Sequence, residues 1–421
     1  GDDEGGSPAP LPEMPSGGES RIDSQGHHIL LQRDGRDTLV ASADHAGGVA
    51  PIAPLTGEQP DLYLVTVDAL RADRIGGDRG LTPHVDALAA ESAVFSHAYT
   101  PTPHTSYALS SMLTGKYLRP VLELPNAPSE HVALPELLRR YGMRTAAFYP
   151  PAIFFVDAHR FEALREGRFG FEYQKEMFAS AQARVPQLVE YLDALDAEEG
   201  PQREVFVWVH LFEPHEPYEP AARFARGDSA EERYDGEVAA VDDAIHQLVR
   251  VFREHRPGAT VVISADHGEE FGDHGGLYHG STLYEEQVRI PLIWSNPDLF
   301  PTPRTTDAMV SHVDLLPTLC ELTGVPNWQS KGFKGVSYSS VVLDPAAPPV
   351  QDYVLFTYDD IYAGQDRTTA PNGVATPPNR IQMIRTADFK YSRYYDAAGV
   401  ELDQEEFYDL RTNGGDFDST W

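Results

Sequence analysis

Apolar residues gather in short β-rich runs that alternate with stretches of helical periodicity. Three of these runs are followed directly by a side chain that can bind a metal or move a proton: 62–67 by Asp68, 205–209 by His210, and 261–265 by Asp266. Each run is rich in β-branched or aromatic residues, which favours buried strands. The pattern therefore predicts several core strands that end on polar residues.

Segments with helical spacing lie between these strands. We predict helices over 82–89, 106–113, 134–141, 182–195, 237–252 and 312–322, and further strands over 143–149, 288–294, 353–357 and 389–392. Residues 28–31 and 37–40 are predicted to form a short hairpin on the main body. The alternation predicts an α/β fold with a mostly parallel central sheet covered by helices on both faces, and a smaller antiparallel sheet near the C-terminus.

Composition divides the chain into four predicted parts. Residues 1–20 are rich in Gly, Pro, Ser and acidic residues and are predicted to be a flexible linker. Residues 21–60 form an N-terminal extension that packs on the core, 61–330 the catalytic α/β core, and 331–421 a C-terminal α+β subdomain. The opening residues resemble a linker left after an upstream signal peptide, lipid anchor or membrane domain was removed.

Charge and cysteine content narrow the functional classes. The 421 residues carry 33 basic and 65 acidic side chains, a net charge of −32, which argues against nucleic acid and against an anionic membrane surface as partners. Cys320 is the single cysteine, so no intrachain disulfide forms and the redox compartment stays open. The sequence has no apolar run of 18 or more residues, which argues against a transmembrane segment, and no secretory signal.

Two predicted strand ends supply metal-binding groups. Asp68 follows one buried strand, and Asp266 with His267 follows another far downstream. In open α/β sheets, ligands bind outside the carboxyl ends of the strands. We therefore predict that these three side chains share one metal site, the alternative being that they are ordinary capping or surface residues.

Thr105 is the predicted nucleophile. It follows two prolines that keep the chain extended, and a helix that stops at Gly115 begins beside it. A metal lowers the pKa of a bound water from about 15.7 to about 7, and the same effect would act on a bound hydroxyl. A helix N-terminus also suits a phosphate or sulfate group. The alternative is that Thr105 is only a helix cap.

Three histidines fill out the predicted site. His210 and His215 follow a buried strand, and His279 lies in a glycine-containing loop after Asp266. We predict that these three imidazoles bind the substrate through its oxyanion oxygens; holding a second metal or protonating a leaving group are the other roles that fit. The alternative for each is a loop histidine that satisfies its own hydrogen bonds. We assign no ligand role to His104.

An ordered set of motifs resembles the sulfatase family of the alkaline phosphatase superfamily. The matching segments are 64–73 (LVTVDALRAD), 81–89 (LTPHVDALA), 113–115 (LTG), 214–218 (PHEPY), 266–269 (DHGE), 283–292 (LYEEQVRIPL), 311–318 (SHVDLLPT) and 407–411 (FYDLR). The resemblance covers residues from about 60 to the end. It implies an alkaline phosphatase-like three-layer α/β/α fold, a divalent metal and an ester substrate.

The departures from that family are specific. Sulfatases carry a Cys or Ser that is converted to formylglycine, with Pro two residues later and Arg four residues later. Here Thr105 stands at that place, followed by Ser-Tyr-Ala-Leu. A threonine resembles instead the phosphoethanolamine transferases, lipoteichoic acid synthases and nucleotide pyrophosphatases, and His279 with Gly280 also resembles the first of these. Ala69 replaces a second Asp found in many sulfatases, which implies a metal site one carboxylate short.

We therefore predict a metal-dependent phosphoryl-ester hydrolase or phosphotransferase. Asp68, Thr105, Asp266 and His267 are the predicted ligands of the first ion. Mixed N/O ligands suit Zn or Mn better than Mg. Mg and Ca stay open as alternatives, and one or two ions fit the sequence. The predicted substrate is an anionic ester, with lipid and glycan head groups included, and the predicted location is periplasmic or extracellular. The alternatives are a sulfatase without formylglycine and a degenerate member that only binds anions. The oligomeric state stays open.

Overall fold

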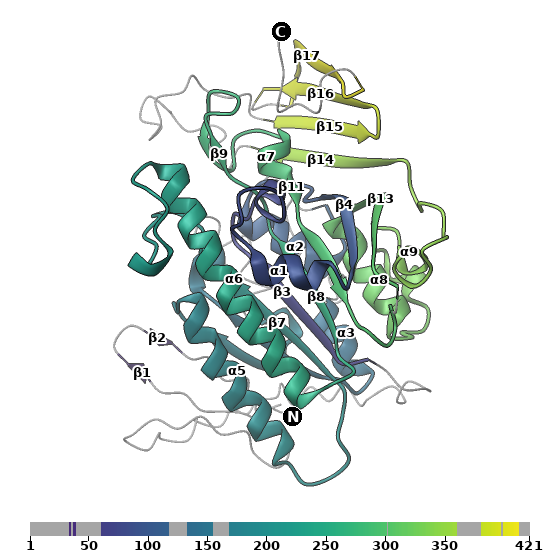
Figure 1. The fold of residues 1–421 in the computed structure, drawn as a ribbon. Coiled ribbons are helices and arrows are strands. Elements are labelled where there is room, and N and C mark those ends of the chain that lie inside the picture. The colour runs from purple at the N-terminus through teal and green to yellow at the C-terminus, as the bar shows by residue number, and fades with distance from the viewer. Residues whose placement is uncertain are drawn as a thin grey trace, which may run out of the picture.

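The fold is seen in a computed structural model of the chain (Figure 1). It describes residues 33–34, 37–38, 60–117, 133–154, 168–300, 302–359, 380–396 and 399–411. The predicted linker over 1–20 lies outside the described residues. So does most of the predicted N-terminal extension, and the domain boundaries stay predictions.

A nine-stranded mixed sheet forms the centre of the described structure. Its strands are β3 (Leu62–Val67), β4 (Ala93–Tyr99), β5 (Arg144–Tyr149), β6 (Tyr173–Glu176), β7 (Val205–Leu211), β8 (Thr260–Ala265), β11 (Arg289–Ile290), β12 (Leu292–Ser295) and β13 (Arg304–Ser311). The strand order is β11-β4-β12-β8-β3-β7-β5-β6, with β13 paired to β4. Strands β6, β5, β7, β3 and β8 are parallel to one another, whereas β12 is antiparallel to both β8 and β4.

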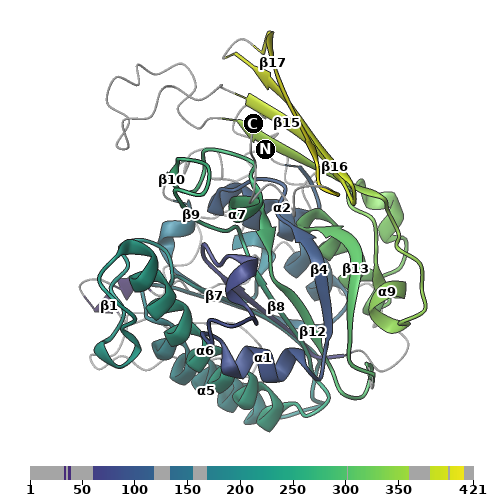
Figure 2. The same ribbon diagram turned by 45° about the horizontal axis from the view of Figure 1, so that its top comes forward.

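Helices cover both faces of this sheet (Figures 1 and 2). One face carries α1 (Pro83–Ala89), α5 (Ala181–Asp196) and α6 (Ala230–His255), and the other carries α2 (Thr105–Thr114), α3 (Leu134–Arg140), α8 (Leu315–Leu322) and α9 (Ser339–Leu343). Short 3₁₀ turns lie at Ala72–Arg74, Pro151–Phe154, Arg168–Gly170, Ala222–Phe224, His312–Asp314 and Trp328–Lys331. The arrangement confirms the predicted three-layer α/β/α fold.

The register of the three central strands brings their carboxyl ends level. Val67 at the end of β3 lies opposite Leu211 of β7 and opposite Ala265 of β8. Every residue of these three strands is buried, as a sheet covered on both faces requires. Asp68 and Asp266 therefore leave the sheet side by side at one edge.

A four-stranded antiparallel sheet follows near the C-terminus, as predicted. It consists of β14 (Tyr353–Asp359), β15 (Arg380–Thr386), β16 (Phe389–Tyr395) and β17 (Glu401–Asp409). Its inner face packs on the short helix α7 (Glu285–Val288), where the buried Arg385 donates to Glu285 Oε1 at 2.8 Å. A small hairpin of β9 (Glu270–Phe271) and β10 (Leu277–Tyr278) lies beside α7 in the ribbon (Figure 2).

Several predicted elements need correction. Strand β7 continues to Leu211, so His210 lies inside the strand and not after it. The strand predicted over 288–294 is two strands, because Pro291 has no N–H to continue the ladder. Helix α6 begins at Ala230, seven residues before the predicted start, where Ser229 and Glu232 form a capping box. In the region of the predicted hairpin the structure describes the antiparallel pair β1 (Arg33–Asp34) and β2 (Asp37–Thr38), whereas the predicted strand 28–31 lies outside the described residues.

None of the helices in the described part of the chain combines the length and the apolar character needed to cross a bilayer.

Candidate functional site

Asp68, Asp266 and His267 meet at the carboxyl edge of β3 and β8. One ligand atom from each lies within 4.8 Å of the other two, and all three side chains are buried. His267 Nε2 is 3.3 Å from Asp266 Oδ2 and 3.6 Å from Asp68 Oδ1. The structure thus brings together the three residues that the strand ends predicted.

The backbone around Ala69 holds Asp266 in place. Ala69 has a φ of 57°, a left-handed conformation that is strained for a residue other than glycine. Its N–H donates to Asp266 Oδ1 at 3.0 Å, and the N–H of His267 donates to the same oxygen at 2.8 Å. These two bonds leave Asp266 Oδ2 to face the site. Many sulfatases have a second Asp at the position of Ala69. In this chain the backbone N–H of Ala69 holds Asp266 instead.

Thr105 is the first residue of α2, and its hydroxyl oxygen lies 3.0 Å from His267 Nε2. The residue that caps α2 is His104, whose backbone is extended, so Thr105 is not the helix cap. The side chain of Thr105 is largely buried, with 8% of its surface exposed. The hydroxyl of Thr105 therefore lies between the metal-binding cluster, which carries carboxylates, and the positive end of a ten-residue helix.

The ring of His267 is oriented by the main chain of the next residue. Its Nδ1 donates to the carbonyl oxygen of Gly268 at 2.9 Å, which leaves the lone pair of Nε2 directed toward Thr105 and the carboxylates. A hydrogen bond of this type on one ring nitrogen commonly fixes the other as a metal ligand. Gly268 has no room for a side chain, because a Cβ there would lie 2.0 Å from the carbonyl oxygen of Glu286.

The donor set fits a divalent cation. Asp68 Oδ1, Asp266 Oδ2 and His210 Nε2 are buried polar atoms without a hydrogen-bond partner among the described residues. Burial and the negative charge of Asp68 raise the pKa of Asp266, as expected for two carboxylates enclosed side by side. Burial acts in the same direction on Asp68, but the surrounding imidazoles, with His215 first, lower its pKa overall. A cation bound between them would satisfy all three orphaned atoms.

His210 reaches the site from the interior of β7. Its Nδ1 lies 2.8 Å from Thr66 Oγ1, and Thr66 Oγ1 also accepts a hydrogen bond from Trp208 Nε1 at 2.9 Å. Its Nε2 lies 3.7 Å from Asp68 Oδ2. His210 was predicted to bind substrate, but its Nε2 lies beside a carboxylate of the metal-binding cluster.

His215 and His279 lie next to each other at the edge of the cluster. Their ring centroids are 5.0 Å apart, and the ring of His279 lies 4.3 Å from that of His267. Burial would lower the pKa of His279, but the charge and hydrogen bond of Glu269 outweigh burial and raise it. The His279 ring thus packs against that of His267, which contacts Thr105, and its raised pKa favours the protonated, hydrogen-bond-donating form.

Two further residues contact the predicted site residues without a predicted role of their own. Glu269 binds His279, and Thr66 orients His210. Glu269 belongs to the Asp-His-Gly-Glu string, which was a usable signal, whereas Thr66 reads as an ordinary strand residue. His104 is kept neutral because burial lowers its pKa to about 3. Its ring packs on Tyr107. The expectation that His104 is no metal ligand stays a prediction.

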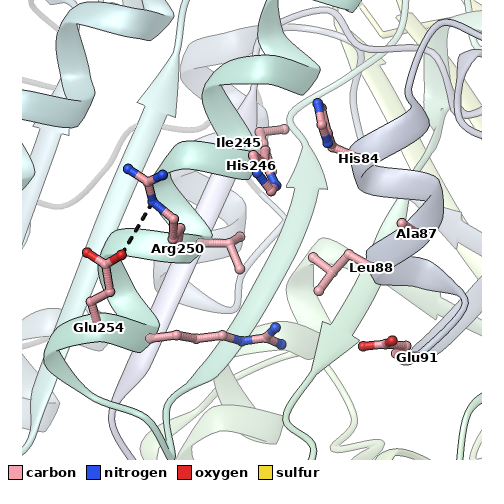
Figure 3. Close-up of a pocket in the computed structure, with 10 residues that line it drawn as sticks. His84, Ala87, Leu88, Glu91, Ile245, His246, Arg250 and Glu254 are labelled. Carbon is pink, nitrogen blue, oxygen red and sulfur yellow. Dashed lines mark ion pairs between the residues drawn. The ribbon is translucent and has the colours of Figure 1, made fainter.

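A cavity of about 410 Å³ lies apart from this site, between α1 and α6 (Figure 3). His84 and His246 stack across it with ring centroids 4.2 Å apart, and Arg250 pairs with Glu254 on its rim. The C-terminal half of α6 leads into the start of β8, so this cavity lies toward the opposite edge of the sheet.

Comparisons with known proteins agree with the geometry. The Sulfatase family profile matches residues 60–325, and the profile "N-sulphoglucosamine sulphohydrolase, C-terminal" matches residues 272–420. The ulvan-active sulfatase of Formosa agariphila is 24% identical over 401 residues, covering 82% of this chain and 75% of that protein. The phosphatidylethanolamine transferase Mcr-1 of Escherichia coli is 31% identical over 98 residues, covering 22% of this chain and 18% of that protein.

A solved structure shares the fold. The phosphonate monoester hydrolase of Agrobacterium radiobacter superposes with a TM-score of 0.60 at 18% identity, covering 85% of this chain and 91% of that one.

Proposed function

The chain belongs to the sulfatase family, and we propose that within it the protein is a metal-dependent phosphoryl-ester hydrolase or phosphotransferase with Thr105 as its nucleophile. Membership of the family makes the protein an ester hydrolase of the sulfate and phosphate ester class. The proposal adds the nucleophile, the metal and the preferred ester.

One observation carries the proposal. The hydroxyl oxygen of Thr105 lies 3.0 Å from His267 Nε2, inside the cluster formed with Asp68 and Asp266. A free threonine hydroxyl is a poor nucleophile near neutral pH because its proton is held tightly, and metal coordination is one way to activate it. The local geometry supports a hydroxyl that shares the cluster's cation.

Asp68, Asp266, His267 and the Thr105 hydroxyl would hold the ion. When bound, the ion supplies a positive charge that favours the deprotonated hydroxyl and offsets the negative charge of the ester. Zn or Mn suits one imidazole with several oxygens better than Mg or Ca. His210 Nε2, which lies 3.7 Å from Asp68 Oδ2, is a further available ligand atom.

Thr105, His215 and His279 have separate roles in the proposed reaction. The Thr105 hydroxyl releases its proton to solvent, and Oγ1 forms a bond to phosphorus while the bond from phosphorus to the alcohol oxygen breaks, which leaves a phosphorylated threonine. His215 and His279 bind the oxygens of the transferred group, and His279 is the candidate donor of the proton that the departing alcohol takes up. Water then releases the group in a hydrolase, and a second alcohol does so in a transferase.

The nature of residue 105 favours phosphate over sulfate. Threonine cannot form the aldehyde hydrate on which sulfatases of the formylglycine type depend. The local similarity to a phosphatidylethanolamine transferase also supports phosphoryl transfer. Sulfate-ester hydrolysis without formylglycine is the second candidate, because the relative that aligns over 82% of the chain is an ulvan-active sulfatase.

Substrate class and location follow as parts of the proposal. An anionic ester on a lipid or glycan head group is consistent with both kinds of relative. A periplasmic or extracellular location is supported by similarity to an extracellular sulfatase homolog of Caenorhabditis elegans. The third alternative, a degenerate anion-binding member, has no support, because the predicted ligand side chains are all present.

The test compares Thr105→Ala and Thr105→Ser on an aryl phosphate and on an aryl sulfate. We expect Thr105→Ala to lower kcat by at least about 10³-fold with metal content retained, and Thr105→Ser to keep part of the activity, because serine preserves the hydroxyl. Turnover by Thr105→Ala at the wild-type rate would rule out the nucleophile. Faster cleavage of the sulfate than of the phosphate by the wild type would favour the second candidate.

A further inference from the structure

Glu269 is a buried carboxylate that lies beside the candidate site and contacts His279. It directly follows the Asp266-His267-Gly268 turn, and its side chain has no exposed surface. A buried carboxylate is costly unless it is paired or fully hydrogen-bonded. The partners of Glu269 therefore indicate what the residue does.

The main chain at Glu269 is held from three sides. Its N–H donates to the carbonyl oxygen of Glu286 at 2.9 Å, and the N–H of Gly268 donates to that of Gln287 at the same distance. The carbonyl oxygen of Glu269 accepts from Arg71 Nη1 at 3.1 Å. The carboxylate thus projects from a fixed point just beyond His267.

Both carboxylate oxygens bind groups from other segments. Oε1 lies 3.0 Å from His279 Nδ1, and Oε2 accepts the hydroxyl of Tyr218 at 2.8 Å. Tyr218 belongs to the loop after β7 that also carries His215, and His279 directly follows β10. The carboxylate therefore joins two histidine-bearing loops to the turn that supplies two metal-binding residues.

We propose that Glu269 is a positioning residue: its carboxylate holds the proton on Nδ1 of His279 and so turns Nε2 of that ring toward a group bound at Thr105. Carboxylate partners of this kind fix both the tautomer and the orientation of a functional imidazole. Tyr218 completes the arrangement, because its hydroxyl holds the other oxygen and stops the carboxylate from rotating. The role of His279 in this proposal rests on the proposed function.

The test uses ¹⁵N-histidine NMR of the full chain together with steady-state kinetics. In the wild type we expect a protonated Nδ1 on His279, and in Glu269→Ala we expect that Nδ1–H signal to be lost. We also expect kcat on an aryl phosphate to fall roughly 10- to 100-fold, with KM and metal content little changed. Glu269→Gln keeps an oxygen acceptor at this position and should restore the Nδ1–H signal and much of kcat.

Glu270→Gln is the matched control. Glu270 is the adjacent buried carboxylate, but its oxygens accept from the N–H groups of His274 and Gly276 and from Gln287, and from no imidazole in the part of the chain that the structure describes. This variant should leave the His279 signal as it is in the wild type. An Nδ1–H signal of His279 that persists in Glu269→Ala, or in Glu269→Gln a loss of kcat as large as that in Glu269→Ala, would overturn the proposal.

The NMR signal also separates this inference from the proposed function. It reports the His279 proton in the resting protein, so it does not depend on Thr105 being the nucleophile. An active Thr105→Ala enzyme would refute the proposed function while leaving the link between Glu269 and His279 measurable.

Discussion

Thr105 Oγ1 lies 3.0 Å from Nε2 of His267, although the two residues are 162 positions apart in the chain. The first begins α2 and the second follows the end of β8, so their meeting depends on the whole sheet being in register. The ring of His267 cannot turn away without losing its bond to the carbonyl oxygen of Gly268. The approach of these two atoms is therefore built into the fold.

The first prediction concerns the charge balance of the metal cluster. In protein treated with a chelator, Asp266→Asn should raise the melting temperature above that of the wild type, because the wild type must either bury two adjacent negative charges or take up a proton on Asp266, and the variant does neither. The asparagine keeps the oxygen that accepts from Ala69 and from His267. In metal-loaded protein the order should reverse, because the variant lacks a ligand. Differential scanning calorimetry in both conditions measures the effect.

Asp242→Asn is the control for that experiment. Asp242 is also buried and accepts two backbone N–H groups, from His84 and Val85, but it lies outside the cluster. Its effect on the melting temperature should be the same with and without chelator. If Asp266→Asn behaved like this control, the cluster would not be a metal site.

The second prediction concerns the space at Gly268. Gly268→Ala should destabilise the protein by about 3 kcal/mol or more, because the new Cβ would lie 2.0 Å from a backbone carbonyl oxygen that cannot move freely. Metal affinity should fall with it, since His267 is the preceding residue. Gly258→Ala is the matched control: its Cβ would meet only Asp298 Oδ2, at 3.9 Å. Urea denaturation that gave equal losses for both variants would refute the prediction.

The third prediction concerns pH. Burial raises the pKa of the Asp314 carboxyl to about 6, although hydrogen bonds from Val336, Ser311 and Gln351 act in the opposite direction. The folded state therefore binds this proton more tightly than the unfolded state, whose pKa is about 3.9. The resulting stabilisation is complete below about pH 4 and is lost as the pH rises through about 6.

Asp314→Asn cannot titrate, so it isolates this contribution. The free energy of unfolding of the wild type minus that of Asp314→Asn should fall by on the order of 3 kcal/mol between pH 4 and pH 7, from a shift of about two pKa units. Chemical denaturation at several pH values measures this difference. A difference that stays constant or grows with pH contradicts the prediction.

The elements predicted correctly are those whose apolar residues form a clear pattern along the chain. The runs before Asp68 and Asp266 are continuously apolar because the sheet covers them on both faces, and those strands end where predicted. Strand β13 was missed because its first half alternates between exposed and half-buried residues at the edge of the sheet. The start of α6 was missed because its first turns are polar, although the Ser229–Glu232 capping box marked it.

In the candidate site, too, some features have a signal in the sequence and others have none. The proximity of Asp68 and Asp266 was predicted because both follow buried strands, and Thr105 was singled out by a helix start together with the family resemblance. Their roles stay predictions. The contact between Glu269 and His279 was not predicted, because the loop between them has no periodicity that fixes its course. Their pairing depends on where the β9–β10 hairpin folds back, which only the three-dimensional structure determines.

The most direct test of the account is to trap the covalent intermediate. Wild-type protein mixed with an aryl phosphate is quenched in acid within the first turnovers, digested, and analysed by tandem mass spectrometry. The account predicts a phosphate on the side chain of Thr105, absent after chelation of the metal. Product release in the same samples with Thr105 unmodified, or with the phosphate on another residue, would contradict it.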